Sequence, residues 1–221
     1  MSSESSSPAK SLVTEDWVGQ VPKVDTPFET LAYLKRHAPW ASVLVNAPEK
    51  YIPVLVPYKL PQNTTENTFL REIMPPTVPH HIALYHEGLS SFPSPDQPST
   101  QVVAATAARE FGTIFTLFAL TSLSNGYADT AHGGLIGVLF DELLGMCIAC
   151  EMETFAFTLE TKVAYKKRIA TPKVVLGRGR IIKEEGRKVW VTAELVDGET
   201  GEVHATAESL WLKSREGMAR L

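Results

Sequence analysis

The sequence predicts an α+β protein in which one long helix packs against a curved antiparallel sheet. Residues 134–151 form a run that is apolar on nearly every side, a strand-like run precedes it at 111–120, and four more strand-like runs follow it. A helix without a polar face must be covered on most sides. A sheet that curls around the helix would provide that cover.

The first part of the chain predicts a disordered N-terminus followed by a helix. Residues 1–25 are rich in serine, and we expect them to be disordered. The helix should begin with Thr26 as its N-cap and Pro27 in its first turn. It should stop before Pro39, because proline cannot continue a helix.

The residues that follow predict an irregular extension. Prolines are frequent between this helix and residue 100, with one strand-like run at 80–87 and a loop-like run at 91–100. We therefore divide the chain into an N-terminal extension, residues 26–100, and one C-terminal domain, residues 101–215.

The C-terminal domain should end in a meander of antiparallel strands. Two turn signals, Glu185-Gly186 and Asp197-Gly198, separate strand-like runs that are rich in β-branched and aromatic residues. The four runs are 155–165, 173–184, 188–197 and 203–213.

Composition and charge narrow the class of function. The 221 residues carry a formal net charge of −4, which gives no general attraction to nucleic acid. No apolar run approaches the ~20 residues that span a bilayer, so no membrane span is expected. The N-terminus lacks the apolar segment of a secretory signal and the arginines of a mitochondrial one. We therefore expect a cytoplasmic protein.

The two cysteines, Cys147 and Cys150, have C-x-x-C spacing. This spacing can serve redox chemistry or form half of a zinc site. Zinc would need two more ligands, and the sequence has no other cysteine. Both residues lie late in the apolar helix, where free cysteine packs as a small apolar residue. The structural interpretation is therefore favoured.

Two carboxylates, Asp141 and Glu142, interrupt the apolar helix near its middle. Burying an ionised carboxylate is costly unless the group is paired or functional. Successive residues lie about 100° apart around a helix, so at most one of the two points at a given site. Asp141 is the candidate catalytic residue. The alternative is that both side chains reach solvent at an exposed edge.

The helix begins with His132-Gly133-Gly134. A helix N-terminus presents unpaired N–H groups and a positive dipole end, and glycines let another group approach the backbone closely. Gly133 and Gly134 are therefore candidate contacts for a carbonyl oxygen or oxyanion. The alternative is a tight turn that uses glycine for conformation, with His132 capping or packing.

The spacing of the candidates has a consequence for assembly. Gly133 and Asp141 are eight residues apart, which is roughly 12 Å along a helix axis. One reacting carbonyl cannot contact both residues of the same helix. If both act on one substrate, they must come from two antiparallel copies, which requires at least a homodimer with two equivalent sites.

The segments "AHGGLIGVLFDELLG" and "FTLETKVAYKKRI" resemble the hot-dog-fold acyl-CoA thioesterases, in the branch with an HGG turn and an aspartate nine residues after the histidine. The resemblance covers about residues 110–213. It implies a long helix wrapped by an antiparallel sheet, in dimers that often pair into homotetramers. The first hundred residues exceed a minimal hot-dog domain and resemble the extended N-termini of some eukaryotic, particularly fungal, members.

The resemblance also implies a reaction and roles for five residues. Asp141 would be the general base or nucleophile in the hydrolysis of an acyl-CoA to free acid and CoA. The Gly133 N–H would polarise the thioester carbonyl, and Thr158 would help to orient the water. Asn125 would lie near the carbonyl, and His132 would hold the turn. No cofactor or metal is implied.

Basic residues are concentrated between 162 and 188, where only two glutamates oppose them. Such a patch would suit the phosphates of CoA. Lys166, Lys167 and Arg168 are the best candidates, because they follow the expected strand at 155–165. The alternative is a set of ordinary solvent-facing strand residues.

Two other functions remain open from the sequence. One is a non-catalytic acyl-thioester-binding or regulatory protein on the same fold. The other is an enoyl-thioester hydratase, a class that typically pairs a histidine with an acid in a different motif. The joint presence of Asp141, Gly133 and Thr158 favours the hydrolase.

Overall fold

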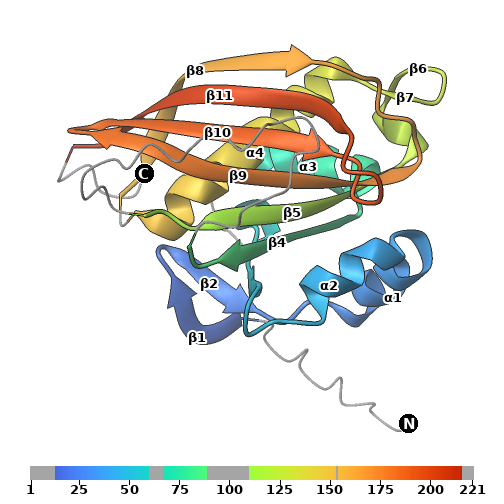
Figure 1. Cartoon of the computed structure of the whole chain (residues 1–221), viewed down its shortest axis with the longest axis horizontal. Coiled ribbons are helices and arrows are strands. Elements are labelled where there is room, and N and C mark those ends of the chain that lie inside the picture. The colour runs from blue at the N-terminus through green and yellow to red at the C-terminus, as the bar shows by residue number, and fades with distance from the viewer. Residues whose placement is uncertain (1–12, 60–66, 89–109, 153, 216–221) are drawn as a thin grey trace, which may run out of the picture.

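The computed structural model describes residues 13–59, 67–88, 110–152 and 154–215, in which a nine-stranded antiparallel sheet packs against one long helix, α4 (Gly133–Glu151) (Figure 1). The strands lie side by side in the order β1-β2-β3-β4-β5-β9-β10-β11-β8. They are β1 (Val13–Val18), β2 (Val21–Val24), β3 (Ile52–Val54), β4 (His80–His86), β5 (Thr113–Leu120), β8 (Ala156–Tyr165), β9 (Lys173–Glu185), β10 (Lys188–Val196) and β11 (Val203–Lys213).

Short helices and a small ribbon complete the described part of the chain. The α-helices are α1 (Phe28–His37), α2 (Ser42–Val45) and α3 (Thr68–Thr77). The 3-10 turns are η1 (Pro39–Ala41), η2 (Pro57–Lys59) and η3 (Ser122–Ser124). Just before α4, β6 (Asn125–Tyr127) and β7 (Thr130–Ala131) pair in a two-stranded ribbon.

The main core lies between α4 and the inner face of the sheet. Glycines in β9 let the helix approach closely: a Cβ at Gly177 would lie 3.0 Å from Leu143, and one at Gly179 would lie 3.0 Å from the Cys147 sulfur. Alternate strand residues face opposite sides. The "GRGR" run therefore turns its glycines to the helix and its arginines to the outer face.

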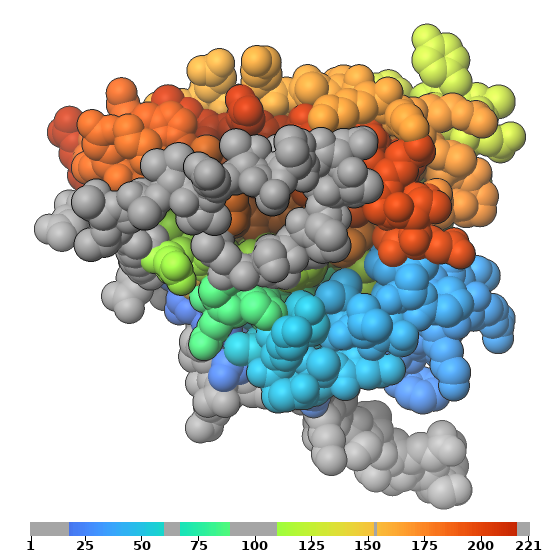
Figure 2. Space-filling view, viewed as in Figure 1, coloured from blue at the N-terminus to red at the C-terminus, as the bar shows by residue number. Residues whose placement is uncertain are grey.

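A second core covers part of the outer face of the sheet. Leu34 of α1, the following residue Ala38 that caps its C-terminus, and Leu44 of α2 pack with buried side chains of β4, β5 and β9. In the space-filling view the N-terminal segment, blue to cyan, abuts the red C-terminal part of the sheet (Figure 2). There Trp40 fills the space beside Gly198, where a Cβ would lie 2.2 Å from its ring. The sheet is thus covered on both faces.

The α+β class and the packing of a long helix on an antiparallel sheet are confirmed. The helix that we expected at 134–151 begins one residue earlier, at Gly133. The expected strands appear as β4 and β5 and as the four strands after α4. Their patterns were readable because each is long and strongly apolar or β-branched.

The expectation of disorder over residues 1–25 is wrong for residues 13–24, which form the β1–β2 hairpin. The hairpin turn packs on the C-terminal end of α4, where the Gln20 N–H donates to Ala149 O (2.8 Å) and its side-chain amide donates to Met152 O (2.6 Å). These bonds satisfy carbonyls that the helix leaves free. Residues 1–12 lie outside the described chain.

The extension also differs from expectation. Helix α1 is preceded by Pro27 as N-cap, without a side-chain cap bond, so Thr26 does not cap it. The segment holds two helices, α2 and α3, in addition to α1. Helix α3 forms although it contains Pro75 and Pro76, because both prolines fall near its end. Strands β3 and β4 join the main sheet. The expected loop at 91–100 lies outside the described residues, and the domain boundaries stay a prediction.

Helix α4 also meets the length and composition of a membrane span. Its most apolar window has a mean hydropathy of 1.7, contrary to the expectation that no run approaches a span. Half of that window is buried inside the protein. Core helices of soluble folds share this composition when a sheet covers them, so the apolar surface of α4 has an explanation within the fold.

Candidate active site

The structure brings Asp141 and Thr158 together. Asp141 lies on the exposed side of α4, and Thr158 lies on β8 opposite the inward-facing Trp211. The Thr158 hydroxyl donates a 3.0 Å hydrogen bond to Asp141 Oδ1. The pairing register therefore directs Thr158 toward the helix.

Glu142 has different surroundings from its neighbour. It is half-buried on the side of α4 that faces η2. Burial, and then the charge of Asp141, raise the pKa of Glu142 to about 7. Burial, and then the charge of Glu142, raise the pKa of Tyr58, whose hydroxyl lies 3.0 Å from Nδ1 of the buried His81. Asp141 is exposed and Glu142 only partly so, and the alternative that both carboxylates reach solvent therefore describes Asp141 better than Glu142.

His132 caps α4. Its Nδ1 accepts a 2.9 Å hydrogen bond from the Gly134 N–H, and its backbone is extended, as an N-cap requires. A Cβ at Gly134 would lie 3.0 Å from that same nitrogen. The glycine at 134 is therefore explained by the cap, in line with the capping alternative for His132.

The His132 cap does not explain why residue 133 is a glycine. A Cβ there would lie 3.7 Å or more from its nearest neighbours, the ring atoms of Tyr165, which is an ordinary contact. No hydrogen bond from the Gly133 N–H to another described residue is found. Neither crowding nor an unusual backbone within the described chain calls for glycine at this position. The first N–H of the helix is thus available to a further group.

Tyr165 is a residue at the site whose contact the sequence did not indicate. Its hydroxyl donates a 2.9 Å hydrogen bond to the carbonyl of Gly133, 32 positions earlier in the chain. The resemblance included this tyrosine in the strand motif without a role. A contact between a strand end and a helix start leaves no periodic signal in the sequence.

The side chain of Asn125 is hydrogen-bonded to the loop that connects β8 and β9. It begins β6, and its Oδ1 accepts a hydrogen bond from the Thr171 hydroxyl. The same loop also supports the approach to α4, since the Ala131 N–H donates to Ile169 O (3.0 Å). The η3 turn adds a second bond there, from the His132 N–H to Ser124 O (2.8 Å). The residues before α4 and those after β8 therefore form one connected unit.

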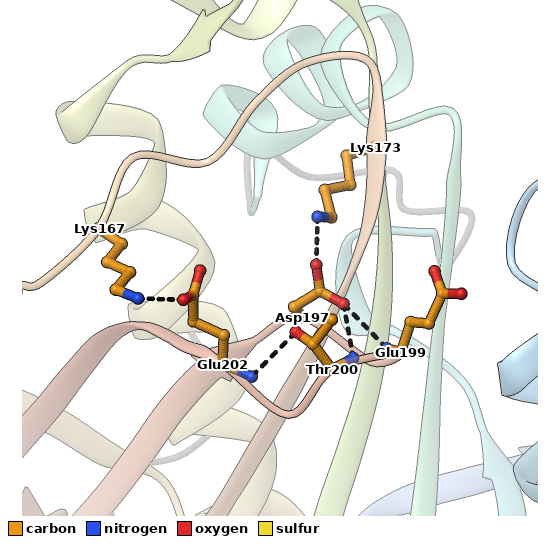
Figure 3. Close-up of polar contacts among 6 residues, drawn as sticks. All are labelled: Lys167, Lys173, Asp197, Glu199, Thr200 and Glu202. Atoms are coloured by element: carbon orange, nitrogen blue, oxygen red, sulfur yellow. Dashed lines mark hydrogen bonds and ion pairs between the residues drawn. The ribbon is translucent and has the colours of Figure 1, made fainter.

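The basic patch is smaller than the sequence suggested, because several members have acidic partners. Lys167 pairs with Glu202, and Lys173 pairs with Asp197 (Figure 3). Arg178 and Lys183 also form ion pairs. Pairing with carboxylates leaves these four residues less available to a phosphate than unpaired cations would be. Lys166 and Arg168 remain exposed at the end of β8.

The turn between β10 and β11, which begins at Asp197, is bonded to Lys173 at the start of β9, next to the other basic residues. Burial opposes ionisation of Asp197, but hydrogen bonds from Lys173 and from the backbone N–H groups of Thr200 and Glu199 outweigh it and lower its pKa to about 2 (Figure 3). The β10–β11 turn is thereby tied to the start of β9. The connection from β8 to β9 is held at both of its ends.

The two cysteines fit the structural interpretation. Cys147 and Cys150 are both free and buried, and burial raises the pKa of each thiol. Cys147 Sγ donates to Leu143 O (3.2 Å) and packs against Gly179. Within the described residues, no three His, Cys, Asp or Glu side chains gather in a group that could hold a metal.

Comparison with known proteins matches the part of the chain that holds these residues. Residues 128–204 match the sequence profile of the thioesterase superfamily. The expected resemblance is confirmed over this range. Rat acyl-coenzyme A thioesterase THEM4 is 31% identical over 88 residues, which are 40% of this chain and 37% of the rat protein. The chain thus spans less than two fifths of the length of this relative.

Two solved structures that match part of this chain are more distant in sequence than the rat protein. A hypothetical thioesterase from Streptococcus pneumoniae, solved with coenzyme A, has a TM-score of 0.43 and 18% identity, covering 46% of this chain and 81% of that one. Zebrafish thioesterase superfamily member 2 has a TM-score of 0.43 and 16% identity, covering 49% and 78%.

Proposed function

We propose that the protein hydrolyses acyl-CoA thioesters to free acid and CoA. The observation that carries this proposal is the 3.0 Å hydrogen bond from Thr158 to Asp141 on a largely apolar helix. A carboxylate held by a hydroxyl on an exposed face is suited to act on water or on a carbonyl. The match of residues 128–204 to the thioesterase superfamily and the likeness to a rat acyl-coenzyme A thioesterase support it.

The start of α4 supports a role for Gly133 as the donor to the thioester oxygen. Its N–H is the first of the helix, at the positive end of the dipole. Gly134 differs, because its N–H is already taken by His132. A carbonyl oxygen that becomes an oxyanion is stabilised by a donor of this kind. The absence of a side chain leaves room for the substrate.

The two parts of the site belong to two subunits in this proposal. Asp141 and Gly133 are roughly 12 Å apart along one helix, so a second copy must supply one of them. A row of two small residues, Gly133 and Gly137, leads to Asp141 at four-residue spacing on the partly exposed side of α4. Among the described residues, no atom outside the nearby backbone of α4 itself lies within 4 Å of a Cβ added at Gly137. Small residues let two helices approach closely, so this row suits a second α4.

The edge of the sheet suits the same assembly. Strand β8 is the last in the strand order, and its Phe157 and Leu159 are about half-exposed. An apolar edge strand is a surface that normally needs a partner. A homodimer that pairs along this side would bury both β8 and the open side of α4. A homotetramer remains an expectation from the family.

The chemistry follows one of two routes. In the first, Asp141 accepts a proton from water as the water oxygen attacks the thioester carbon. In the second, the Asp141 carboxylate attacks, and water then hydrolyses the anhydride that forms. In both, the carbon–sulfur bond breaks and the thiolate of CoA leaves and takes up a proton. The Gly133 N–H stabilises the oxyanion, and neither route needs a metal or cofactor.

Lys166 and Arg168 are the proposed contacts for CoA phosphates. Both are exposed, and both follow Tyr165, which contacts the start of α4. Phosphate groups are favoured near such cations and near a helix N-terminus. Lys167 is a weaker candidate, because it already pairs with Glu202.

The test is CoA release from short, medium, long-chain and aromatic acyl-CoAs by the wild type, Asp141→Asn and a control, Asp129→Asn. Both substitutions keep the size and remove one charge, and Asp129 is an exposed residue of the β6–β7 turn. We expect Asp141→Asn to lose about two orders of magnitude in rate. The control should match the wild type.

Three other outcomes would contradict the proposed hydrolysis or the role of Asp141 in it. An inactive wild type that still binds acyl-CoA would indicate the non-catalytic binding protein. Hydration of an enoyl-CoA without CoA release would indicate the hydratase. Equal rates for Asp141→Asn and the wild type would remove Asp141 from the mechanism.

A further inference from the structure

Tyr165 stands at the end of β8 and contacts the start of α4. Its hydroxyl donates a 2.9 Å hydrogen bond to the Gly133 carbonyl, and its ring lies beside the same residue. The strand end is itself held, because the N–H groups of Lys166 and Lys167 both donate to His204 O (2.9 and 3.0 Å). The tyrosine therefore connects a fixed strand end to a glycine.

This contact matters because of what Gly133 is proposed to do. Glycine has the widest choice of backbone conformations, whereas a donor to an oxyanion must be directed accurately. The carbonyl and the N–H of Gly133 share one Cα, so a bond that holds the carbonyl also restricts the N–H. The His132 cap does not do this directly, because its hydrogen bond goes to Gly134.

We infer that Tyr165 is a positioning residue for thioester hydrolysis, which holds the Gly133 carbonyl and so keeps the Gly133 N–H directed at the developing oxyanion. The inference rests on the proposed function. Strand β8 would then support two parts of the site, since Thr158 holds Asp141 and Tyr165 holds Gly133. In the proposed dimer, these two residues of one strand serve two different sites.

The test compares Tyr165→Phe with a matched control, Tyr127→Phe, at an 84% exposed tyrosine of β6. The phenylalanine at 165 keeps the ring and removes only the hydrogen bond. We expect kcat to fall about 3- to 10-fold with KM for the best acyl-CoA unchanged. The Gly133 amide signal in a ¹H–¹⁵N spectrum should shift and exchange faster. The control should change none of these quantities.

Two results would overturn the inference. One is a kcat for Tyr165→Phe equal to that of the control. The other is a loss of kcat that accompanies a fall in Tm while the Gly133 amide signal is unchanged, which would mean a merely structural role. If the wild type hydrolyses no acyl-CoA, the proposed function fails. The Gly133 amide signal then decides alone whether Tyr165 holds this residue.

Discussion

Asp141 and Glu142 are adjacent in sequence but lie in different electrostatic environments. Asp141 is exposed and accepts a hydrogen bond from Thr158, whereas Glu142 is half-buried beside the η2 turn. The 100° between successive helix residues produces this separation. One carboxylate is thus available for chemistry at the surface, and the other is a half-buried acid with a raised pKa.

Glu142 should make stability depend on pH. Its pKa rises from 4.5 to about 7 on folding, so its stabilising contribution is fully present below pH 4.5 and is lost as pH rises through 7. The loss is about 3 kcal/mol. Glu142→Gln should remove this dependence and should be more stable than the wild type at pH 8. Urea unfolding of both proteins at pH 4.5 and pH 8 measures the difference, and parallel pH dependence in the two would refute it.

At the scale of single residues, the sequence was sufficient to predict which residues carry chemistry, but it was insufficient to predict which residues they contact. Asp141 was conspicuous because a carboxylate in an apolar helix needs a reason, and Thr158 came from the family resemblance. The contact of Tyr165 with Gly133 could not be predicted, because nothing local relates a strand end to a helix start 32 positions away. The acidic partners of Lys167 and Lys173 were hidden for the same reason.

Helix α4 is secured at both ends by other parts of the chain. His132 caps its first turn, and the β1–β2 hairpin covers its last carbonyls. The hairpin turn approaches closely: a Cβ at Gly19 would lie 2.5 Å from the carbonyl oxygens of Ala149 and Cys150. The hairpin therefore contributes to holding the helix that carries the site.

Gly19→Ala should destabilise the protein far more than Gly186→Ala. Both glycines have a φ of +57°, so both substitutions introduce the same left-handed strain. Only Gly19 faces backbone atoms, whereas Gly186 has open space. We expect about 1 kcal/mol for Gly186→Ala and about 3 kcal/mol or more for Gly19→Ala. Thermal unfolding provides the comparison, and equal costs would show that the hairpin does not press on α4.

For helices and strands, the length of the sequence pattern decided whether the element could be predicted. Helix α4 and the strands around it are long enough for periodicity to identify them. Strands β1 and β2 span only 6 and 4 residues, and β2 joins the rest of the sheet through β3, where Lys23 pairs with the distant Val54. Helix α3 was missed because Pro75 and Pro76 suggested an irregular segment.

The whole molecule leaves one side of α4 and the β8 edge without a described partner, while helices α1 and α2 cover part of the outer face of the sheet. The uncovered side carries the small residues and Asp141. A glycine inside a helix costs about 1 kcal/mol relative to alanine. The described chain supplies no contact that accounts for Gly137, and a second copy would.

Gly137→Leu should therefore convert a dimer to a monomer. The added side chain would keep two α4 helices apart, and activity should be lost together with the dimer. Ala32→Leu is the matched control, because it adds a similar side chain at an exposed position of α1. Light scattering during size exclusion gives the mass of each variant. A Gly137→Leu protein that stays dimeric and active would exclude this side of α4 from the interface.

The central claim, that each site takes Asp141 from one subunit and Gly133 from the other, is tested most directly by mixing two inactive variants. Asp141→Asn removes the carboxylate. Gly133→Pro removes the N–H and adds a ring. The helix start tolerates it, since the first helical position accepts proline and His132 already has the extended backbone that must precede it. After the subunits re-equilibrate, half of the dimers are mixed, and each mixed dimer regains one complete site. We predict that activity returns to roughly a quarter of the wild-type value. Mixtures that stay as inactive as the separate variants, although mixed dimers form, would contradict the account.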